Sequence, residues 1–300
     1  MDGLLHQGIL GTQFPPCKRA KIGPVSACRV SFVGTMLNPS GTPVEQPILQ
    51  VRGLARTFGG IVAVKDFSVD VYAGSIHGLI GPNGAGKTTT VNVISGFYAP
   101  SAGRVYYQGR DISGHGTSAL AALGLVRTFQ GATLFNQLSV LDNVRVGCHG
   151  GAKANLLRRI FGRDRATEAK ADRKARDILD FFRLQALADE LAANLPHGHQ
   201  RALGMAVALA AKPKLLLLDE PFTGMNPEET KRMAGLVRRV RDEQGVTIML
   251  IEHDMQAVMG ICETITVMNF GTLLAQGTPQ EVRANRSVIE AYLGSPGDAA

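Results

Sequence analysis

The 300-residue sequence has few cysteines, no long apolar run and no segment that resembles a secretory signal. Its four cysteines, Cys17, Cys28, Cys148 and Cys262, are widely spaced without a CxxC pair, so we expect reduced thiols, not a disulfide framework or a zinc site. The longest apolar runs, 203–211 and 215–218, fall well short of the roughly twenty residues that a membrane-spanning helix requires. No apolar core follows a basic start, as it would in a signal peptide.

Charged residues are also scarce, at 19% of the chain, whereas apolar residues make up 45%. These are the values of a globular protein and argue against a disordered one. The net charge of +7 allows an anionic partner such as a nucleotide, a nucleic acid or membrane headgroups. A soluble protein with a basic surface is the simpler explanation of the charge alone.

The N-terminal segment differs in composition from the remainder. Residues 1–46 are rich in glycine and proline, lack periodicity and carry a small basic cluster at Lys18, Arg19 and Lys21. We expect a disordered N-terminal extension here, with Met36 as an alternative start. A membrane or nucleic-acid role for the cluster is the less favoured alternative. Residues 47–295 are expected to form the folded domain.

Hydrophobic patterning within residues 47–295 predicts an α/β fold. Residues 48–54 and 61–72 alternate apolar with polar side chains, as half-buried antiparallel strands do. LLLLDEP and TIMLIEHD are short apolar runs that end in acidic residues, which is typical of strands buried in a parallel sheet. The ligand of such a sheet is expected at the carboxyl ends of its strands. A helical insertion is predicted at about 131–205; we read its mixed charges as a solvated face, with a surface facing lipid headgroups as the alternative.

The stretch GPNGAGKTT matches a P-loop, the glycine-rich loop that binds nucleotide phosphates. Its glycines allow successive backbone N–H groups to point at a phosphate, and the helix that follows adds its positive end. Lys87 supplies a mobile positive charge, and the Thr88 hydroxyl is a candidate ligand for Mg²⁺. The predicted nucleotide-binding residues are Gly81, Pro82, Asn83, Gly84, Ala85, Gly86, Lys87, Thr88 and Thr89.

Polar residues after the later apolar strands complete a hydrolytic set. Asp219 ends LLLLDEP and is a candidate Mg²⁺ ligand, and Glu220 is a candidate base for the attacking water. His253 follows the next strand, so it should emerge beside Glu220. Gln130, in RTFQG, is a candidate for contacting Mg²⁺ or the water. Each of these is weak evidence alone, and their order after a P-loop is what makes them informative.

That order resembles the ATPase subunits of ABC transporters over about 48–294. NP in GMNPEE, IEHDM followed by VM, and the tail GTPQEVRANRSVIEAYLG resemble one branch, the LivG-type subunits of branched-chain amino acid importers. The resemblance implies a P-loop ATPase core with an antiparallel β subdomain and an inserted helical subdomain, using ATP and Mg²⁺. It also implies that Phe58 stacks on adenine and that the segment with Leu134 and Phe135 faces the permease.

The same resemblance implies a peripheral subunit at the cytoplasmic face of the cell membrane. Its partners would be a second ATPase subunit, two permease subunits and, indirectly, a periplasmic substrate-binding protein, with no nucleic acid. Alternatives are a transporter ATPase for urea, amides or lipids, or an ABC ATPase acting on nucleic acid or the ribosome. A P-loop kinase is disfavoured, because a kinase gains nothing from a water-polarising pair.

Two elements depart from the ABC pattern, the signature and the loop that contains Asn226. The signature, typically LSGGQ, closes over the ATP held by the other subunit; here its residues are Pro196, His197, Gly198, His199 and Gln200. Pro196 removes a hydroxyl, but Gly198 and the start of the helix remain, so we expect a weakened but functional element. A metal site at His197 and His199 is the poorer hypothesis, because no third ligand lies nearby. Asn226 stands where an aspartate often crosses the dimer interface.

Overall fold

Two β-sheets organise the described part of the chain. The computed structural model describes residues 46–128, 134–149 and 165–293. Residues 1–45, most of the predicted N-terminal extension, lie outside the described residues. The larger sheet has the strand order β10-β9-β3-β8-β7-β6. Its strands are β3 (Ile76–Ile80), β6 (Leu125–Thr128), β7 (Leu215–Asp219), β8 (Thr247–Ile251), β9 (Thr264–Asn269) and β10 (Thr272–Gly277).

All pairings in this larger sheet are parallel except β9 with the edge strand β10. Every residue of β3, β7 and β8 is buried, as the unbroken apolar runs predict. Alternate residues of β7 enter different cores: Leu216 and Leu218 pack with the helices on one face, and Leu215 and Leu217 pack on the other. The sheet is therefore the middle layer of the fold.

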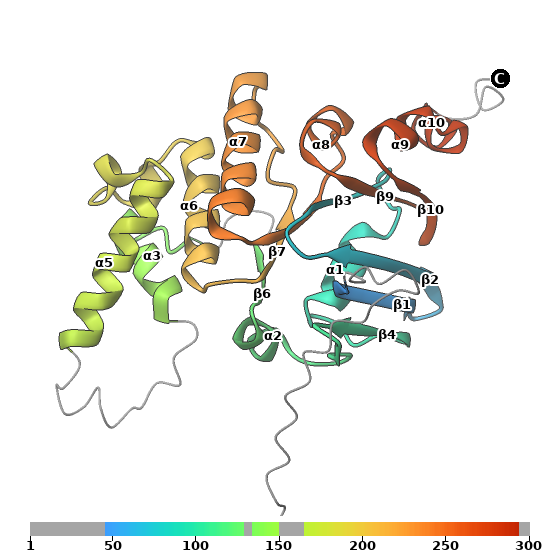
Figure 1. Ribbon diagram of the computed structural model, residues 1–300, viewed down its shortest axis with the longest axis horizontal. Helices are drawn as coiled ribbons and strands as arrows, with labels where there is room; N and C mark the ends of the chain where they lie inside the picture. The colour runs from blue at the N-terminus through green and yellow to red at the C-terminus, as the bar shows by residue number, and fades with distance from the viewer. Residues whose placement is uncertain (1–45, 129–133, 150–164, 294–300) are drawn as a thin grey trace, which may run out of the picture. The chain divides into compact units, whose positions relative to one another are not determined.

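The smaller sheet is antiparallel, with the order β2-β1-β4-β5. Its strands are β1 (Pro47–Phe58), β2 (Ile61–Tyr72), β4 (Ala102–Tyr107) and β5 (Arg110–Asp111). Helix α1 (Lys87–Ile94) shares one hydrophobic core with this sheet and with the second face of the parallel sheet. The antiparallel β subdomain thus lies against the helix that opens at the P-loop (Figure 1).

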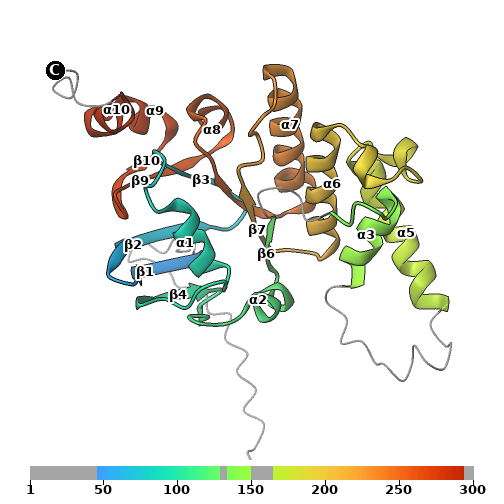
Figure 2. The same cartoon turned by 180° about the vertical axis from the view of Figure 1, so that it is seen from behind.

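Helices cover the other face and form a separate group at one end. Between β6 and β7 along the chain, α3 (Val140–His149), α5 (Arg165–Phe181) and α6 (His197–Ala210) pack on one another, and both views place them opposite the antiparallel strands (Figures 1 and 2). The remaining elements are α2 (Thr117–Leu123), η1 (Gln185–Leu187), η2 (Ala192–Asn194), α7 (Pro227–Gln244), α8 (Met255–Ile261), α9 (Pro279–Ala284) and α10 (Arg286–Leu293).

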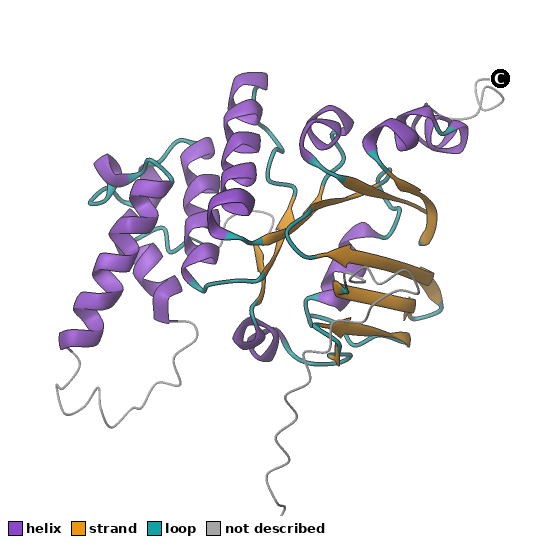
Figure 3. Cartoon of the chain, in the orientation of Figure 1, coloured by secondary structure: helices purple, strands orange, loops and turns teal. Residues whose placement is uncertain are grey.

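The predicted α/β class, with an antiparallel subdomain and an inserted helical group, is confirmed (Figure 3). The charged segment predicted as helical contains α5, while residues 150–164 lie outside the described residues. Among the helices that the structure describes, none combines the length and the apolar character needed to cross a lipid bilayer.

Candidate nucleotide-hydrolysis site

The loop between β3 and α1 has the close backbone packing that its glycines predict. A Cβ atom at Gly81 would lie 2.2 Å from the Met268 carbonyl oxygen, and one at Gly86 would lie 2.6 Å from that of Ala63. Gly86 also has a φ of 97°, in the region that favours glycine. The loop is therefore wedged between strands, and its amides lie at the positive end of α1. The other predicted phosphate-binding residues, Pro82, Asn83, Gly84, Ala85, Thr88 and Thr89, lie in this loop and in the first turn of α1.

The Lys87 side chain folds back onto this loop. Its Nζ donates to the carbonyl oxygens of Gly81 at 2.6 Å and Pro82 at 3.0 Å. Burial lowers the pKa of Lys87, and the negative charges of Glu220, Asp219 and Glu252 oppose that shift. Lys87 therefore lies close enough to the carboxylates at the ends of β7 and β8 to interact with them electrostatically.

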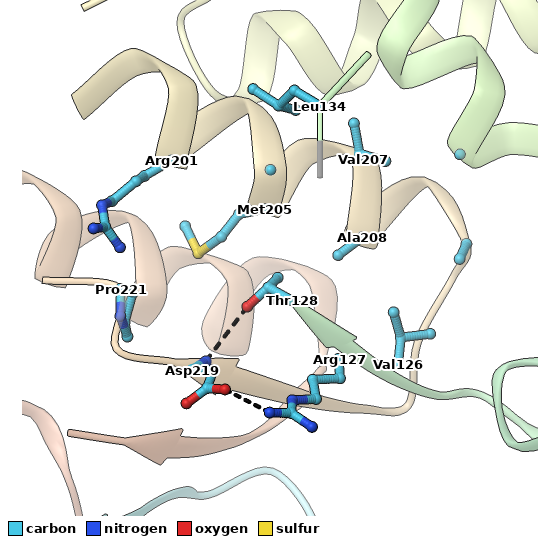
Figure 4. A pocket seen from close by; sticks show the side chains of 13 residues that line it. Val126, Arg127, Thr128, Leu134, Arg201, Met205, Val207, Ala208, Asp219 and Pro221 are labelled. Atoms are coloured by element: carbon cyan, nitrogen blue, oxygen red, sulfur yellow. Dashed lines mark hydrogen bonds and ion pairs between the residues drawn. The ribbon is translucent and has the colours of Figure 1, made fainter. Parts of the chain in front are cut away.

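Asp219 is buried where β7 ends, beside β6 (Figure 4). Its Oδ2 accepts from Arg127 Nη2 at 2.6 Å, and its backbone N–H donates to Thr128 Oγ1 at 3.4 Å. Arg127 also donates to Asn92 Oδ1 at 2.5 Å and to Ser95 Oγ at 3.1 Å. A single buried guanidinium thus connects the end of β7 to helix α1.

Glu220 follows Asp219 with a φ of 46°, an unusual conformation for a residue with a side chain. Its carboxylate accepts from Thr223 Oγ1 at 3.3 Å, and its Oε1 lies 3.7 Å from Nδ1 of His253. Because β7 and β8 are adjacent and parallel, their ends deliver these two side chains to the same edge of the sheet. The expected proximity of His253 to Glu220 is what the structure shows.

Glu252 is completely buried, and its Oε2 lies 3.8 Å from Nδ1 of His253. Its Oε1 accepts the Phe222 N–H at 2.8 Å, and its Oε2 accepts the His253 N–H at 3.1 Å. Burial raises the pKa of Glu252, although the backbone N–H donors oppose the rise. Glu252 was not among the predicted site residues, although a glutamate directly after the apolar strand β8 was a visible signal.

Comparison with known proteins decides what kind of site this is. A sequence model described as ABC transporter matches residues 64–223, and one described as branched-chain amino acid ATP-binding cassette transporter matches residues 272–298. The high-affinity branched-chain amino acid transport ATP-binding protein LivG of Escherichia coli (strain K12) is 41% identical over 253 residues, which are 84% of this chain and 99% of that protein. The chain belongs to the ABC transporter family. Like the other ATP-binding subunits of that family, it is an ATPase.

Further similarities support this family assignment. The transport ATP-binding protein BraF of Pseudomonas aeruginosa is 40% identical over 84% of this chain and 99% of its own length. The crystal structure of a nucleotide-free ATP-binding cassette from an ABC transporter superposes with a TM-score of 0.74 and 30% identity, covering 83% of this chain and 100% of that one. The ADP conformation of an ATP-binding cassette gives the same values.

Helix α6 of this ABC protein begins within the predicted signature. Pro196 is the residue before the helix, and it provides no side-chain hydrogen bond to the helix end. His197 and His199 are exposed, and the position of a Cβ at Gly198 meets nothing closer than Glu229 Oε1, at 3.8 Å. Gln200 has a structural contact, donating to the Leu195 carbonyl oxygen at 3.0 Å.

Asn226 caps α7, a function that the sequence analysis did not assign. Its side chain accepts from the Glu229 N–H at 2.9 Å, and the Glu229 side chain accepts from the Asn226 N–H at 3.0 Å. Asn226 and Glu229 form a capping box, and Pro227 occupies the first helical position; both signals are readable from the sequence NPEE. The side-chain oxygen is therefore engaged within its own subunit.

Phe58 is the last residue of β1 and packs against a second aromatic ring. The Phe58 ring packs edge-on against Tyr98 with ring centroids 5.2 Å apart, and the Arg56 guanidinium lies 4.5 Å from the Phe58 centroid. Phe58 is 37% exposed, so an aromatic surface is accessible beside β1. Gln130 lies outside the described residues.

The two residues predicted to face the permease have different environments. Phe135 is 54% exposed, and its backbone is bound by the Asn143 side chain. Leu134 is half-buried and lines a pocket of about 260 Å³ together with Met205 and Asp219 (Figure 4). Phe135 thus offers an exposed ring and Leu134 lines a neighbouring pocket, and the permease contact of this segment stays a prediction.

Proposed function

We propose that this ABC ATPase powers the uptake of branched-chain or related amino acids through partner permease subunits. The C-terminal segment 272–298 matches a family described by that substrate class, and LivG and BraF match over nearly their whole length. These similarities favour amino acids over urea, amides or lipids.

The observation that carries the proposed chemistry is the convergence of Lys87, Glu220 and His253 at one edge of the parallel sheet. The loop amides and Lys87 bind the phosphates of ATP, and Glu220 accepts a proton from the attacking water. His253 Nδ1, 3.7 Å from the Glu220 carboxylate, orients that carboxylate and the water. Phe58 provides an aromatic surface for the adenine.

Magnesium fits the donors that the site offers. Arg127 occupies Oδ2 of Asp219 and leaves Oδ1 for a cation, while the Thr88 side chain is exposed at the first turn of α1. Mg²⁺ typically uses one or two protein oxygens together with substrate phosphates. We therefore assign Thr88, Asp219 and Gln130 as the residues that hold it directly or through water. When bound there, Mg²⁺ supplies positive charge that neutralises the phosphates.

The partners follow from the same proposal. Two ATPase subunits pair so that the signature of each, Pro196 to Gln200, closes over the ATP of the other. The pair drives two permease subunits from the cytoplasmic face of the cell membrane, and Phe135 contributes an exposed aromatic ring to the permease contact. A separate binding protein selects the amino acid, and nucleic acid has no part.

Replacement of the proposed base tests the chemistry. Glu220→Gln retains Asp219 and the P-loop, so we expect normal ATP binding, while turnover falls by roughly 10²–10⁴-fold. The measurement is phosphate release beside equilibrium binding of ATP, with Glu290→Gln on α10 as a matched control. Turnover above a tenth of the parental rate would exclude Glu220 as the base.

Transport measurements test the substrate class and the partners. Affinity purification of the chain from its own membrane should recover permease subunits and an ATPase partner. Deletion of its gene should abolish uptake of labelled leucine, isoleucine or valine, and the parental gene, but not the Glu220→Gln gene, should restore it. Loss of urea, amide or lipid transport with intact amino acid uptake would refute the proposed substrate.

A further inference from the structure

The four residues Glu220–Thr223 form a turn directly after β7, and two charged side chains hold its backbone. The turn begins at Glu220, whose φ of 46° is unfavourable for a residue with a Cβ atom. Such a conformation persists where the surroundings fix it. The Glu220 N–H is bound by the Ile251 carbonyl oxygen at 2.9 Å, which ties the first residue of the turn to β8.

Arg201 holds one side of the turn through two carbonyl groups. Its Nη1 donates to the Glu220 carbonyl oxygen at 2.7 Å, and its Nη2 donates to that of Thr223 at 2.8 Å. Arg201 lies on α6, three residues after Gly198, and therefore projects from the helix that opens with the signature. The planar guanidinium suits this bidentate contact, since its donors are fixed relative to one another.

Glu252 holds the other side through an amide. Its fully buried carboxylate accepts the Phe222 N–H with one oxygen and the His253 N–H with the other. The carboxylate thereby links the turn to the residue that lies beside the Glu220 side chain. A single carboxyl side chain can bind both N–H groups because each of its two oxygens accepts a hydrogen bond.

We propose that Arg201 and Glu252 form a bracket around Glu220–Thr223 that positions the Glu220 carboxylate for catalysis. The bracket is defined by these two side chains, one binding carbonyl groups and the other an amide of the same turn. Because Arg201 projects from α6, a displacement of the signature helix moves the backbone of Glu220. The bracket thus connects the part of the subunit expected to contact the partner's ATP with the base of its own site. This inference rests on the proposed function of Glu220, and neither bracket residue contacts the reacting atoms.

A double-mutant cycle with Glu220→Gln tests the positioning function. In the full chain we expect Arg201→Ala to lower kcat for ATP hydrolysis by about 10–100-fold with KM changed less than about threefold, because phosphate binding is untouched. The kcat of Arg201→Lys should lie between those of the parent and Arg201→Ala, because an ammonium group can bind one carbonyl oxygen but lacks the planar geometry that binds two. In the Glu220→Gln background, single-turnover rates with and without Arg201→Ala should agree within about twofold, because the group being positioned is gone.

Glu252→Gln provides the second arm. Glutamine presents one acceptor oxygen and one donor NH₂ where two backbone N–H groups require acceptors, so one of them loses its partner. We expect a drop in kcat of the same order as in Arg201→Ala, again without effect once Glu220 is Gln. Arg286→Ala, which removes an exposed arginine on α10, should match the parent in both backgrounds.

The outcomes separate three conclusions. An equal loss of rate in both backgrounds, or an unchanged kcat in Arg201→Ala, would overturn the bracket. High turnover of Glu220→Gln itself would overturn the proposed function and the bracket with it. If Arg201→Ala does not fold, as circular dichroism would reveal, Arg201→Lys in the two backgrounds gives the same decision.

Discussion

Arg127 Nη2 donates to Asp219 Oδ2 at 2.6 Å, and their side chains are only 5% and 3% exposed. The same guanidinium binds Asn92 on α1, the helix that follows the P-loop, and Ser95, which directly follows that helix. Because Asp219 is a proposed Mg²⁺ ligand, the contact with Arg127 fixes the orientation of its carboxylate. Arg127 also connects β6 and β7 to α1. Buried pairs of this kind are costly to break from one side, because the remaining charge is left without compensation.

Arg127→Met should therefore lower the free energy of unfolding by about 3–5 kcal/mol. Urea titration measures this loss, and Arg286→Met, which removes an exposed arginine, serves as the control. The double variant Arg127→Met, Asp219→Asn should recover part of the loss, because the orphaned charge is then absent. Equal midpoints for Arg127→Met and the control would show that the pair contributes little to stability.

Lys87→Ala should weaken ATP binding itself, in contrast to Glu220→Gln. Removing a charged donor to the phosphates is expected to lower affinity by roughly 10–100-fold. The measurement is equilibrium binding of ATP, with Lys170→Ala, an exposed lysine on α5, as control. An affinity equal to that of the parent would remove Lys87 from the phosphate site.

The cap of α7 predicts how substitutions at Asn226 are ordered. Asn226→Ala should cost about 1 kcal/mol of stability, because the Glu229 N–H loses its acceptor. Asn226→Asp retains that acceptor and adds a negative charge at the positive end of the helix, so its stability should equal or exceed that of the parent. Thermal unfolding of the three proteins checks the order. An Asp variant as unstable as the Ala variant would contradict the capping function.

Structural features that depend only on neighbouring residues in the sequence could be predicted. The P-loop, the buried strands β7 and β8 and the antiparallel pair β1 and β2 are each encoded by local glycine spacing or hydrophobic periodicity. The meeting of Glu220 and His253 followed from the rule that adjacent parallel strands deliver their carboxyl ends to one edge.

Features that depend on distant partners were not predictable. Arg127 and Asp219 are 92 residues apart, and Arg201 binds backbone carbonyl groups that have no sequence signature. The half-burial of Leu134 is a similar case, because it lines a pocket with Met205 of α6 and Asp219 of β7, which are distant in sequence. Asn226 is a different case, because its capping box is encoded by the local sequence NPEE and could have been predicted.

His77 predicts a dependence of stability on pH. This residue of β3 is 1% exposed, and its Nε2 lies 2.8 Å from Thr266 Oγ1 on β9. Burial lowers the pKa of His77 from 6.5 to about 4. Between these values the unfolded chain binds a proton that the folded chain does not. Stability from this group is therefore fully present above pH 6.5 and is lost as the pH falls toward 4.

His77→Gln should flatten that part of the stability profile. Glutamine keeps a polar partner for Thr266 but does not titrate, so the loss of stability from pH 7 to pH 4 should be smaller than in the parent by about 3 kcal/mol. Urea unfolding at several pH values across this range measures the free energy of unfolding of each protein. Comparing the slopes of free energy against pH removes any constant effect of the substitution. It also removes the contribution of the carboxylates, which both proteins share. His115→Gln, at an exposed position, should leave the parental slope unchanged. Parallel profiles for His77→Gln and the parent would mean that His77 accepts its proton in the folded protein as readily as in the unfolded chain.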